Sequence, residues 1–468
     1  MLTVWKKLSE PLDAIRLYSR LKDEEYSILL DSCRRGRYMV LAWDPLRMET
    51  LYHEDGVSPF HRVENLLRAV PKPQVPEEAP PFLTGVIGYL GYELAWFLEE
   101  IGPPKPRKAP VPDGVLIIPG KTVTVDLEKG DTWVAVTTMA EEPQPILDQL
   151  VSRLGEWNRT PLPPLAPGRC GPLVPEIDRE EYKNRVRQVR EWIRRGDIYQ
   201  TNLTYRVSGR AEGDPWGLYR VLRETNPGPY AAFMKFPGFA VLSSSPEQFV
   251  RWDSQEIETK PIKGTRPRGE TPDEDRRLRE ALAQSVKDRA ELVMIVDLER
   301  NDLGKFCETG SVCVPKLCEI EPHPTVWHQV ASVKGTLSPG TGAGSILQSV
   351  FPGGSITGAP KLRSMQIIHG LENSRRGVYT GSIGYIDARG FSEWNIAIRT
   401  LTWQGGELSY HVGGGIVWDS DPEEEYRETL AKGRGMARAV AKWSSRTGDP
   451  SSESAAIFPA RSGFGSIE

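Results

Sequence analysis

The amino-acid sequence predicts an α+β fold in which most strands are antiparallel. Short segments in which apolar and polar residues alternate, such as "LSYHVGGGIVW", are typical of half-buried strands. Longer segments with a helical apolar period, such as "DREEYKNRVRQVREWIRRGD", predict amphipathic helices. The two kinds of segment do not alternate one by one along the chain, which disfavours a doubly wound parallel sheet.

Residues 1–165 are predicted to form a β-rich N-terminal region. The segments "YSILLDS", "YMVLAWD", "GVLIIPG" and "WVAVTTM" indicate strands, and "FLTGVIGYLGYELAWFL" indicates a strand, a glycine turn and a helix. The next segment, "PLPPLAPGRCGPLVP" (161–175), is too rich in proline and glycine to continue a helix or a central strand. We therefore place the main boundary there, followed by a second domain over 176–445 and a disordered tail over 446–468.

The second domain is predicted to combine hairpins with long helices. Its first helix begins with Asp178 and Glu181 at capping-box spacing. Strands around "AAFMKF", "FAVLSS" and "QFVRWD" precede a long helical region over about 273–303. The segments "GSIGYID", "WNIAIRTLTW" and "LSYHVGGGIVW" then predict antiparallel strands, and a last helix begins where Ser420 and Glu423 repeat the capping-box spacing.

Composition favours a small-molecule substrate. The 468 residues include 59 Lys plus Arg against 63 Asp plus Glu, a balance that does not favour nucleic acid or an anionic membrane as partner. The five cysteines form no CxxC pair, which argues against a disulfide framework or a zinc site and indicates a reducing compartment. No apolar run approaches the roughly 18 residues needed to cross a bilayer, and we expect a cytoplasmic protein.

Several carboxylates are candidates for metal binding. Glu425, Glu428 and Lys432 lie at i, i+3 and i+7 of the last helix, which is also the pattern of an ordinary solvated charged face. Glu291 lies on the apolar stripe of another helix, where a carboxylate needs a partner. One or two carboxylates that leave positions open for water and substrate are typical of Mg²⁺ sites, so Glu291 and Glu428 could form one.

Other segments could bind an anion or supply a nucleophile. The glycine-rich turns "FPGGSITGAPK" and "HVGGGIVW" expose backbone N–H groups, and Arg399 could pair with a carboxylate. His328, in "TVWHQVAS", fits a buried core histidine better than a catalyst. Lys263, in "PIKGT", is a surface lysine by default, but loss of its proton would make it a nucleophile, and Glu247 could then act as acid or base.

The chain resembles the chorismate-binding enzymes. The resemblance rests on "GDIYQTNL", "SPEQF", "PIKGT", "KDRAELVMIVDLERND", "FPGGSITGAPK", "GSIGY", "IRT", "GGGIVWDS" and "EEEYRETLAK", in this order. It implies the fold of that family, two antiparallel sheets packed as a sandwich with helices outside. Within the family the chain is most similar to the large subunit of aminodeoxychorismate synthase, which aminates chorismate on the route to p-aminobenzoate and folate.

The resemblance also implies a role for each motif. Glu291 and Glu428, with Glu425 beside them, would hold Mg²⁺ against the ring carboxylate of chorismate. The residues expected to receive the substrate's carboxylates are Arg399, Tyr385, Gly413, Gly414, Gly415, Lys432, Ser355 and Thr357. Gly264, Thr265 and His328 would line the ring near the departing hydroxyl.

Two positions are expected to select the reaction. Relatives that add water carry a lysine base in the segment that matches "GDIYQTNL", whereas this chain has Gln200 there. Anthranilate synthases carry alanine at the position of Lys263. The implied mechanism is attack of Lys263 on C2 of chorismate, with Glu247 as acid, followed by addition of ammonia at C4. An anthranilate synthase large subunit, a dual-use enzyme and a non-catalytic chorismate-binding scaffold remain as alternatives.

Two partners are expected besides chorismate. None of the five cysteines sits in the glycine-flanked elbow of a glutaminase, so ammonia would come from a separate glutamine amidotransferase subunit. The segment "NPGPYAAFM", with Ser32 and "RYM" (37–39), resembles a tryptophan pocket and could hold structural or inhibitory tryptophan.

Overall fold

The structure, a computed structural model, describes residues 1–107, 111–323 and 326–445. The predicted tail over 446–468 lies outside the described residues. Within the described ranges, no helix is both long and apolar enough to span a bilayer.

The N-terminal region is β-rich, as its alternating segments predict. Its strands are β1 (Leu2–Leu8), β2 (Ser27–Asp31), β3 (Tyr38–Leu51), β4 (Gly85–Leu90), β5 (Gly114–Asp126) and β6 (Asp131–Thr138). Its helices are α1 (Ala14–Tyr18), α2 (Pro59–Arg68), the 3₁₀ helix η1 (Tyr92–Phe97) and α3 (Pro143–Arg159). The extended segment that follows α3 contains only the two-residue strands β7 (Arg169–Cys170) and β8 (Val174–Pro175).

The second region alternates hairpins and helices. Its strands are β9 (Gln200–Glu212), β10 (Tyr230–Phe236), β11 (Phe239–Ser245), β12 (Gln248–Trp252), β13 (Glu256–Lys260), β14 (Ile262–Pro267), β15 (Cys313–Pro322), β16 (Val326–Thr336), β17 (Gly358–Ala359), β18 (Ser382–Asp387), β19 (Ser392–Asn395), β20 (Thr400–Gln404) and β21 (Glu407–Ile416). Its helices are α4 (Arg179–Arg194), α5 (Pro215–Thr225), α6 (Pro272–Ala283), α7 (Val286–Gly304), α8 (Ala343–Val350), η2 (Gly354–Ile356), α9 (Lys361–Leu371) and α10 (Pro422–Ser444).

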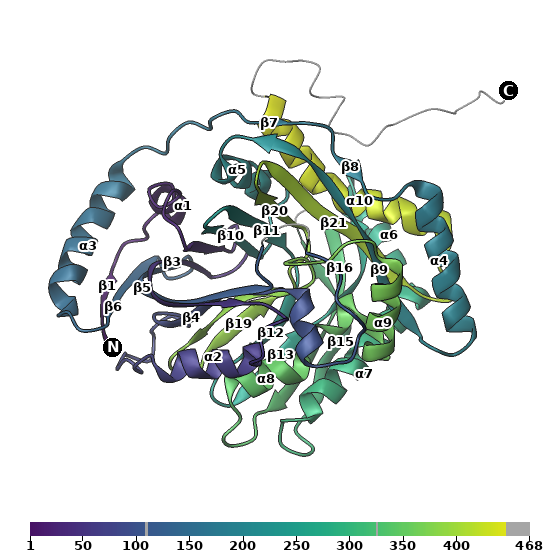
Figure 1. The fold of residues 1–468 in the computed structure, drawn as a ribbon, viewed down its shortest axis with the longest axis horizontal. Coiled ribbons are helices and arrows are strands. Elements are labelled where there is room, and N and C mark those ends of the chain that lie inside the picture. Colours follow the sequence, from purple (N-terminus) through teal and green to yellow (C-terminus); the bar gives the residue numbers. More distant parts are fainter. Residues whose placement is uncertain (108–110, 324–325, 446–468) are drawn as a thin grey trace.

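The fold is α+β, which confirms the fold class, but its strands do not form two separate sheets. All 21 strands belong to one antiparallel hydrogen-bonded network, with α3, α4 and α10 at its periphery (Figure 1). The two regions join within this network because β2 pairs with β10 and β4 pairs with β18. These shared edges replace the expected gap between two sheets.

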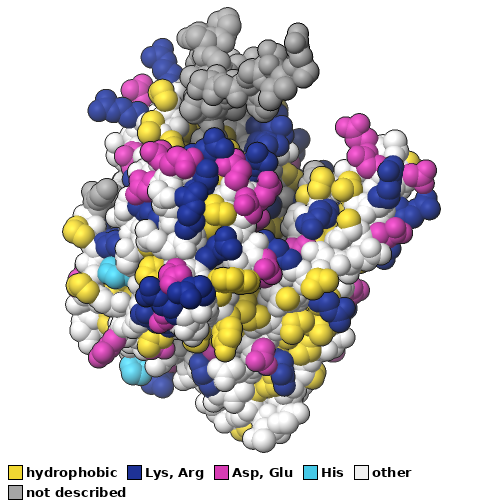
Figure 2. Space-filling model, turned by 90° about the vertical axis from the view of Figure 1, so that its right-hand side faces the viewer, with side chains coloured by type: hydrophobic (Ala, Val, Ile, Leu, Met, Phe, Trp, Pro, Cys, Tyr) yellow, Lys and Arg dark blue, Asp and Glu magenta, His cyan; other side chains and the backbone are white. Residues whose placement is uncertain are grey.

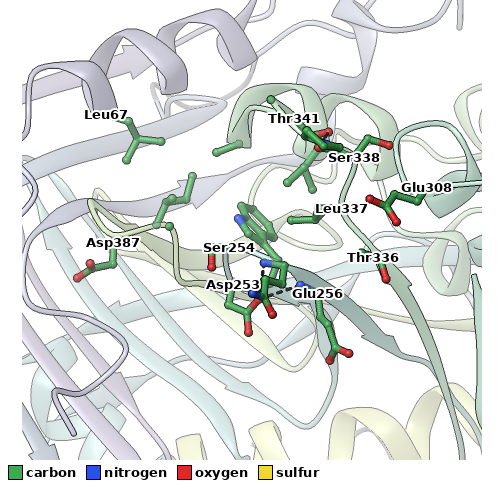
Figure 3. A pocket seen from close by; sticks show the side chains of 18 of the residues that line it. Leu67, Asp253, Ser254, Glu256, Glu308, Thr336, Leu337, Ser338, Thr341 and Asp387 are labelled. Atoms are coloured by element: carbon green, nitrogen blue, oxygen red, sulfur yellow. Dashed lines mark hydrogen bonds between the residues drawn. The ribbon is translucent and has the colours of Figure 1, made fainter. Parts of the chain in front are cut away.

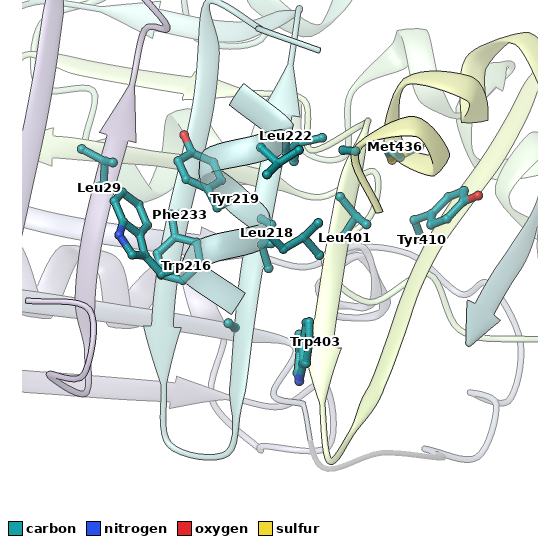
Figure 4. Close-up of a cluster of buried hydrophobic side chains, with 14 of the residues drawn as sticks. Leu29, Trp216, Leu218, Tyr219, Leu222, Phe233, Leu401, Trp403, Tyr410 and Met436 are labelled. Atoms are coloured by element: carbon teal, nitrogen blue, oxygen red, sulfur yellow. The ribbon is translucent and has the colours of Figure 1, made fainter. Parts of the chain in front are cut away.

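The two sequence regions also share a hydrophobic core. Leu29, from the N-terminal region, packs in one cluster with aromatic side chains of α5 and β10 (Figure 4). In that cluster Trp216 stacks on Tyr219 at a centroid distance of 5.6 Å and meets Phe233 edge-on at 5.3 Å. The proline-rich segment 161–175 is therefore a connection along the chain, and the cores on its two sides are continuous.

Two helix boundaries differ from the prediction. The region 273–303 forms two helices, because the chain breaks at Gln284 and Ser285 and the Ser285 hydroxyl accepts the N–H of Asp288. The last helix is capped by Asp421, whose carboxylate accepts two backbone N–H groups, and not by Ser420. Asp178 caps α4 as predicted, with the N–H of Glu181 at 2.8 Å.

Candidate active site

Both glycine-rich segments meet at strand β9. On one side of β9, Gly413 and Gly415 of β21 pair with Thr204 and Asn202. On the other side, the N–H of Asn202 donates to the carbonyl of Thr357, at the end of the turn over 353–357, at 2.8 Å. Segments nearly 60 residues apart in sequence thus form two walls of one recess. We call the backbone of 353–357 and 413–415 the cradle.

Charged and polar side chains lie close to the glycines of the cradle. A Cβ atom on Gly415 would lie 2.3 Å from Nε2 of Gln200 and 3.6 Å from Nζ of Lys263. A Cβ atom on Gly414 would lie 3.4 to 3.5 Å from a carboxylate oxygen of Glu425, one of Glu428 and Nζ of Lys432. Those five side chains come from β9, β14 and α10, and they converge on two adjacent glycines.

Lys263 points into this recess and is not a surface lysine. Its side chain is half-buried, and Nζ donates a hydrogen bond to the backbone carbonyl of Ser355 at 3.1 Å. The next residue, Gly264, has φ +80°, a left-handed conformation that favours glycine. The ammonium group is therefore held between the two cradle segments.

Glu247 lies beside Lys263 and is only 6% exposed. Burial raises the pKa of its carboxyl group, and this effect outweighs the hydrogen bonds from Ser355 and the Ile262 N–H and the positive charges of Lys263 and Lys432. A raised pKa increases the fraction of protonated acid near neutral pH, which suits a proton donor.

The three candidate metal ligands lie on two helices that face the recess. Burial raises the pKa of Glu291 on α7, and the nearby charges of Lys263 and Lys287 oppose this shift. Glu425 accepts hydrogen bonds from the Ser420 hydroxyl at 2.6 Å and from Lys287 at 3.2 Å. Lys432 at 2.8 Å lowers the pKa of Glu428. These carboxylates, two of which contact lysine side chains, supply the oxygen ligands that Mg²⁺ prefers.

The cluster His53, Glu54 and Asp113 lies elsewhere and has a different role. These three side chains are of types that bind metal ions, and their ligand atoms all lie within 4.8 Å of one another. Asp113, however, already binds the guanidinium groups of Arg107 at 2.9 Å and Arg375 at 2.6 Å. This is an ion-pair network between the two regions of the chain.

Arg399 lies near Glu247, and His328 lies near Arg399. Burial lowers the pKa of Arg399, and among the described residues its guanidinium has no hydrogen-bond or ion-pair partner. Burial also lowers the pKa of His328 to about 3, so the ring is neutral, and its Nδ1 lies 2.9 Å from the Thr265 hydroxyl. Thr357, which was expected to bind a substrate carboxylate, donates its hydroxyl hydrogen to the backbone carbonyl of Gly353 at 2.9 Å.

A profile of the chorismate binding enzymes matches residues 25–438, most of the chain. The chain belongs to the chorismate-binding enzyme family. Aminodeoxychorismate synthase component 1 of Bacillus subtilis (strain 168) is 35% identical to it over 437 residues, 90% of this chain and 92% of that protein. Anthranilate synthase component 1 of Aquifex aeolicus (strain VF5) is also 35% identical, over 480 residues, 93% of this chain and 96% of that protein.

Solved structures agree with this assignment. Anthranilate synthase component I from Streptococcus pneumoniae TIGR4 superposes with a TM-score of 0.77 at 32% identity, covering 86% of this chain and 92% of that one. The menaquinone-specific isochorismate synthase MenF of Escherichia coli shares the fold, with a TM-score of 0.73 at 19% identity, covering 94% and 95%. This chain is therefore an enzyme of the chorismate-binding family, and its relatives catalyse more than one reaction.

One residue expected to bind substrate, Tyr385, lies away from the cradle of this chorismate-binding enzyme. It packs against Phe82 at a ring-centroid distance of 4.9 Å and lines a different cavity together with Ile383. Residues two apart on a strand share a face, so Tyr385 belongs to the face of β18 that turns toward the N-terminal region.

Two residues near the cradle were not among the predicted ligands. The ring of Tyr379 stacks on that of His411, which lies two residues before Gly413, at a centroid distance of 4.9 Å. The backbone N–H of the following residue, Thr380, donates to the carbonyl of Ala397, which lies two residues before Arg399. The amide of Gln200 is fully buried, and neither its oxygen nor its nitrogen has a hydrogen-bond partner among the described residues. An unpartnered buried amide indicates a ligand, a signal that only the structure provides.

The cavity beside Tyr385 contains the segments expected to bind tryptophan. It has a volume of about 660 Å³ and is lined by Ser32, Tyr38, Pro229 and Tyr230. The Ser32 hydroxyl is buried without a hydrogen-bond partner among the described residues. The cavity is thus a second polar recess, lined by residues of β12, β13, β18 and β19 together with Tyr38 of β3 and Tyr230 of β10.

A third cavity, of about 640 Å³, opens between the β12–β13 turn, α8 and the β18–β19 turn (Figure 3). Two of its acidic side chains have structural partners: Asp253 accepts the N–H groups of Gln255 and Glu256, and Asp387 binds Arg389 at 2.6 Å. None of the predicted site residues lines it.

On the outer surface, acidic and basic side chains are interspersed (Figure 2), in keeping with the small net charge of −4.

Proposed function

We propose that this enzyme is the large subunit of an aminodeoxychorismate synthase, which converts chorismate and ammonia to 4-amino-4-deoxychorismate and water. The observation that carries the proposal is the position of Lys263, whose Nζ reaches the Ser355 carbonyl and the edge of Gly415. An amine held inside the substrate recess can act as a nucleophile, whereas an enzyme that adds ammonia directly needs no such group.

In the first step, the neutral amine of Lys263 attacks C2 of chorismate. The two conjugated ring double bonds shift toward C4, the C4–O bond breaks, and the oxygen leaves as water after receiving the proton of Glu247. Burial raises the pKa of Glu247, which favours its protonated form. In the product, the nitrogen of Lys263 is bonded to C2, keeps both of its protons and carries a positive charge.

In the second step, ammonia attacks C4, the double bonds shift back, and the bond between C2 and Lys263 breaks. The lysine leaves as a neutral amine because its nitrogen was positively charged in the adduct, and Glu247 regains its proton from the nitrogen that has bonded to C4. Two successive allylic displacements place nitrogen where oxygen stood, without an external oxidant or reductant.

The charged groups of the recess suit the two carboxylates of the substrate. Arg399 and the backbone N–H groups of the cradle would bind one carboxylate. Glu291, Glu425 and Glu428 would hold Mg²⁺, which supplies positive charge next to the other carboxylate and lowers the cost of attack beside it. Ammonia would be delivered by a glutamine amidotransferase subunit.

The closest competing proposal is an anthranilate synthase, which forms anthranilate and pyruvate from the same substrates. The equal identity to relatives of both kinds keeps this alternative, and a dual-use enzyme, in view. A non-catalytic chorismate-binding scaffold is disfavoured, because such a protein needs neither the nucleophile Lys263 nor the acid Glu247 that lies beside it.

Intact-protein mass spectrometry would test the proposal. The purified chain is mixed with chorismate and Mg²⁺ in the absence of ammonia, and Lys263→Ala and Lys260→Ala are treated alike. We expect an adduct of chorismate minus water on the wild type and on Lys260→Ala, and none on Lys263→Ala. Formation of anthranilate and pyruvate upon addition of ammonium, without any adduct, would establish the competing reaction.

We also propose that the cavity beside Ser32 binds tryptophan. The buried Ser32 hydroxyl without a partner and the adjoining volume of about 660 Å³ support this. Calorimetric titration with tryptophan checks it: binding should weaken about tenfold in Ser32→Ala, the loss of one hydrogen bond to a charged group. If wild type neither binds tryptophan nor is inhibited by it, the cavity has another role.

A further inference from the structure

A buried arginine, Arg376, joins the two segments that carry the cradle. It lies in the loop after α9, is 3% exposed, and uses all five of its N–H groups. Nη2 donates to the carbonyl of Asn202 at 2.7 Å, and Nη1 donates to the carbonyl of Ile356 at 3.0 Å. Asn202 belongs to β9, which pairs with Gly413–Gly415, and Ile356 lies in the turn over 353–357.

Glu372 completes the connection to β9. Its carboxylate binds Nε and Nη2 of Arg376 at 2.9 and 2.7 Å and accepts both the N–H and the hydroxyl of Thr204 at 2.9 and 2.8 Å. Thr204 is the strand partner of Gly413. One ion pair, inaccessible to solvent, therefore fixes the strand that forms one wall of the cradle and the turn that forms the other.

The N-terminal region holds this arginine from the opposite side. The ring of Tyr92 stacks on the Arg376 guanidinium at 4.7 Å. The carboxylate of Glu93 accepts the N–H groups of Arg376 and Gly377, each at 2.8 Å, and the N–H of Tyr92 donates to the carbonyl of Gly377 at 2.8 Å. These contacts fix the turn that carries Arg376 to η1, about 280 residues earlier in the chain.

We propose that Arg376 is a positioning residue for the reaction and that η1 of the N-terminal region, through Tyr92 and Glu93, holds it in place. The inference rests on the proposed function for its substrate, but the geometry it describes does not. Arg376 contacts neither the reacting lysine nor Glu247. It acts by keeping the backbone of Ile356 and Asn202, and with it the width of the cradle, constant.

Arg376→Lys keeps the charge but offers three N–H groups on one nitrogen, which cannot span Asn202 and Ile356 as the planar guanidinium does. We expect the KM for chorismate to rise and kcat to fall, together by about 10- to 100-fold in kcat/KM, because displacements of about 1 Å in a substrate-positioning group have effects of that size. The KM for ammonium should not change.

Arg389→Lys is the matched control. Arg389 is likewise a buried arginine that pairs with a buried aspartate, Asp387, and donates to a backbone carbonyl of the N-terminal region, that of Pro80, but it has no contact with the cradle. We expect it to lower the melting temperature without changing kcat or KM. Tyr92→Leu, which removes the stacking ring, serves if Arg376→Lys does not fold, and Tyr92→Phe is its control because the Tyr92 hydroxyl has no hydrogen-bond partner among the described residues.

Hydrogen–deuterium exchange without any ligand separates this inference from the proposed function. Peptides that cover residues 200–205 and 353–358 should exchange faster in Arg376→Lys and Tyr92→Leu than in wild type. In Arg389→Lys and Tyr92→Phe, their exchange rates should equal those of wild type. If the exchange changes as expected but wild type does not turn over chorismate, the proposed function fails and the structural role stands. Wild-type exchange in both segments, or wild-type kcat and KM with only a lower melting temperature, would overturn the inference.

Discussion

Two buried arginines of this enzyme show opposite electrostatic arrangements. Around Arg376, the adjacent Glu372 outweighs the effect of burial and raises the pKa of the guanidinium, and every N–H group has an acceptor within the protein. Around Arg399, burial prevails and lowers the pKa, and the nearest charges are the carboxyl of Glu247 and the like charge of Arg35. Every N–H group of the Arg376 side chain is thus hydrogen-bonded within the protein, whereas Arg399 has no ion-pair partner among the described residues.

The difference indicates which buried polar groups serve folding and which await a ligand. Burying a charge without a partner is costly, so Arg399 and the unpartnered amide of Gln200 destabilise the empty recess. A substrate with two carboxylates would supply the missing acceptors and charges. Substitutions around Arg376 should therefore lower stability, and substitutions around Arg399 should lower activity at little cost in stability.

The largest effect on turnover, Lys263 aside, is expected for Glu247→Gln. The amide keeps the shape of the side chain but cannot protonate the leaving hydroxyl, so kcat should fall by about 10²- to 10³-fold, the usual contribution of a general acid. Because an acid must be protonated and burial raises the pKa of Glu247, wild-type kcat should decline as pH rises through that pKa. Steady-state kcat measured across a broad pH range would show the decline in wild type and not in the variant.

Glu299→Gln provides the control for this pH profile. Glu299, on α7, is a second carboxyl group near Glu247; burial raises its pKa to about 8, although the hydrogen bond from the Thr259 hydroxyl opposes this shift. We expect the alkaline decline to persist in Glu299→Gln. A profile that instead loses its decline there would assign the titration to Glu299 and remove Glu247 from the role of acid.

A smaller effect is expected for Arg399→Met, which sharpens the contrast between the two arginines. Loss of a charge-assisted pair with a carboxylate costs about 1.5–3 kcal/mol, so the KM for chorismate should rise about 10- to 100-fold. The melting temperature should be unchanged or higher, because the substitution removes a buried charge that has no partner in the described structure. A drop in stability as large as that of Arg376→Lys would show that Arg399 is structural.

The sequence was sufficient to predict the family and the α+β class, which followed from the periodicity of the segments. It also indicated Lys263, Glu247 and the carboxylates of α7 and α10 as candidates, because each lies in a short segment with a recognisable pattern, and their roles in the chemistry stay predictions. The sequence could not predict that Gln200, Lys263 and Gly415 meet, because the register between β9 and β21 sets that contact.

The errors have similar physical causes. Tyr385 and Tyr379 are both tyrosines near "GSIGY", but Tyr385 lies within β18 whereas Tyr379 lies in the turn before it and stacks on His411, a difference that the fold sets and the local sequence does not. The break between α6 and α7 contains no proline or glycine, so local propensity did not indicate it, and the Ser285 cap became evident only with the fold. The network around Arg376 depends on contacts across about 280 residues and leaves no local pattern.

The last and smallest effect concerns His328, which lies beside Arg399 and is neutral in the folded protein. Burial lowers its pKa from 6.5 to about 3, so as pH falls below about 6.5 the unfolded chain binds a proton that the folded chain does not. Stability is therefore lost as pH falls through this window, by about 2 kcal/mol between pH 7 and pH 5 at 1.36 kcal/mol per unit. Urea denaturation at both pH values should show a difference smaller by about that amount in His328→Gln, and an unchanged difference when the exposed His61 is replaced by Gln. Equal pH dependence in wild type and His328→Gln would mean that the pKa of His328 is the same in the folded and the unfolded chain, and that the ring becomes charged beside Arg399 as pH falls below about 6.5.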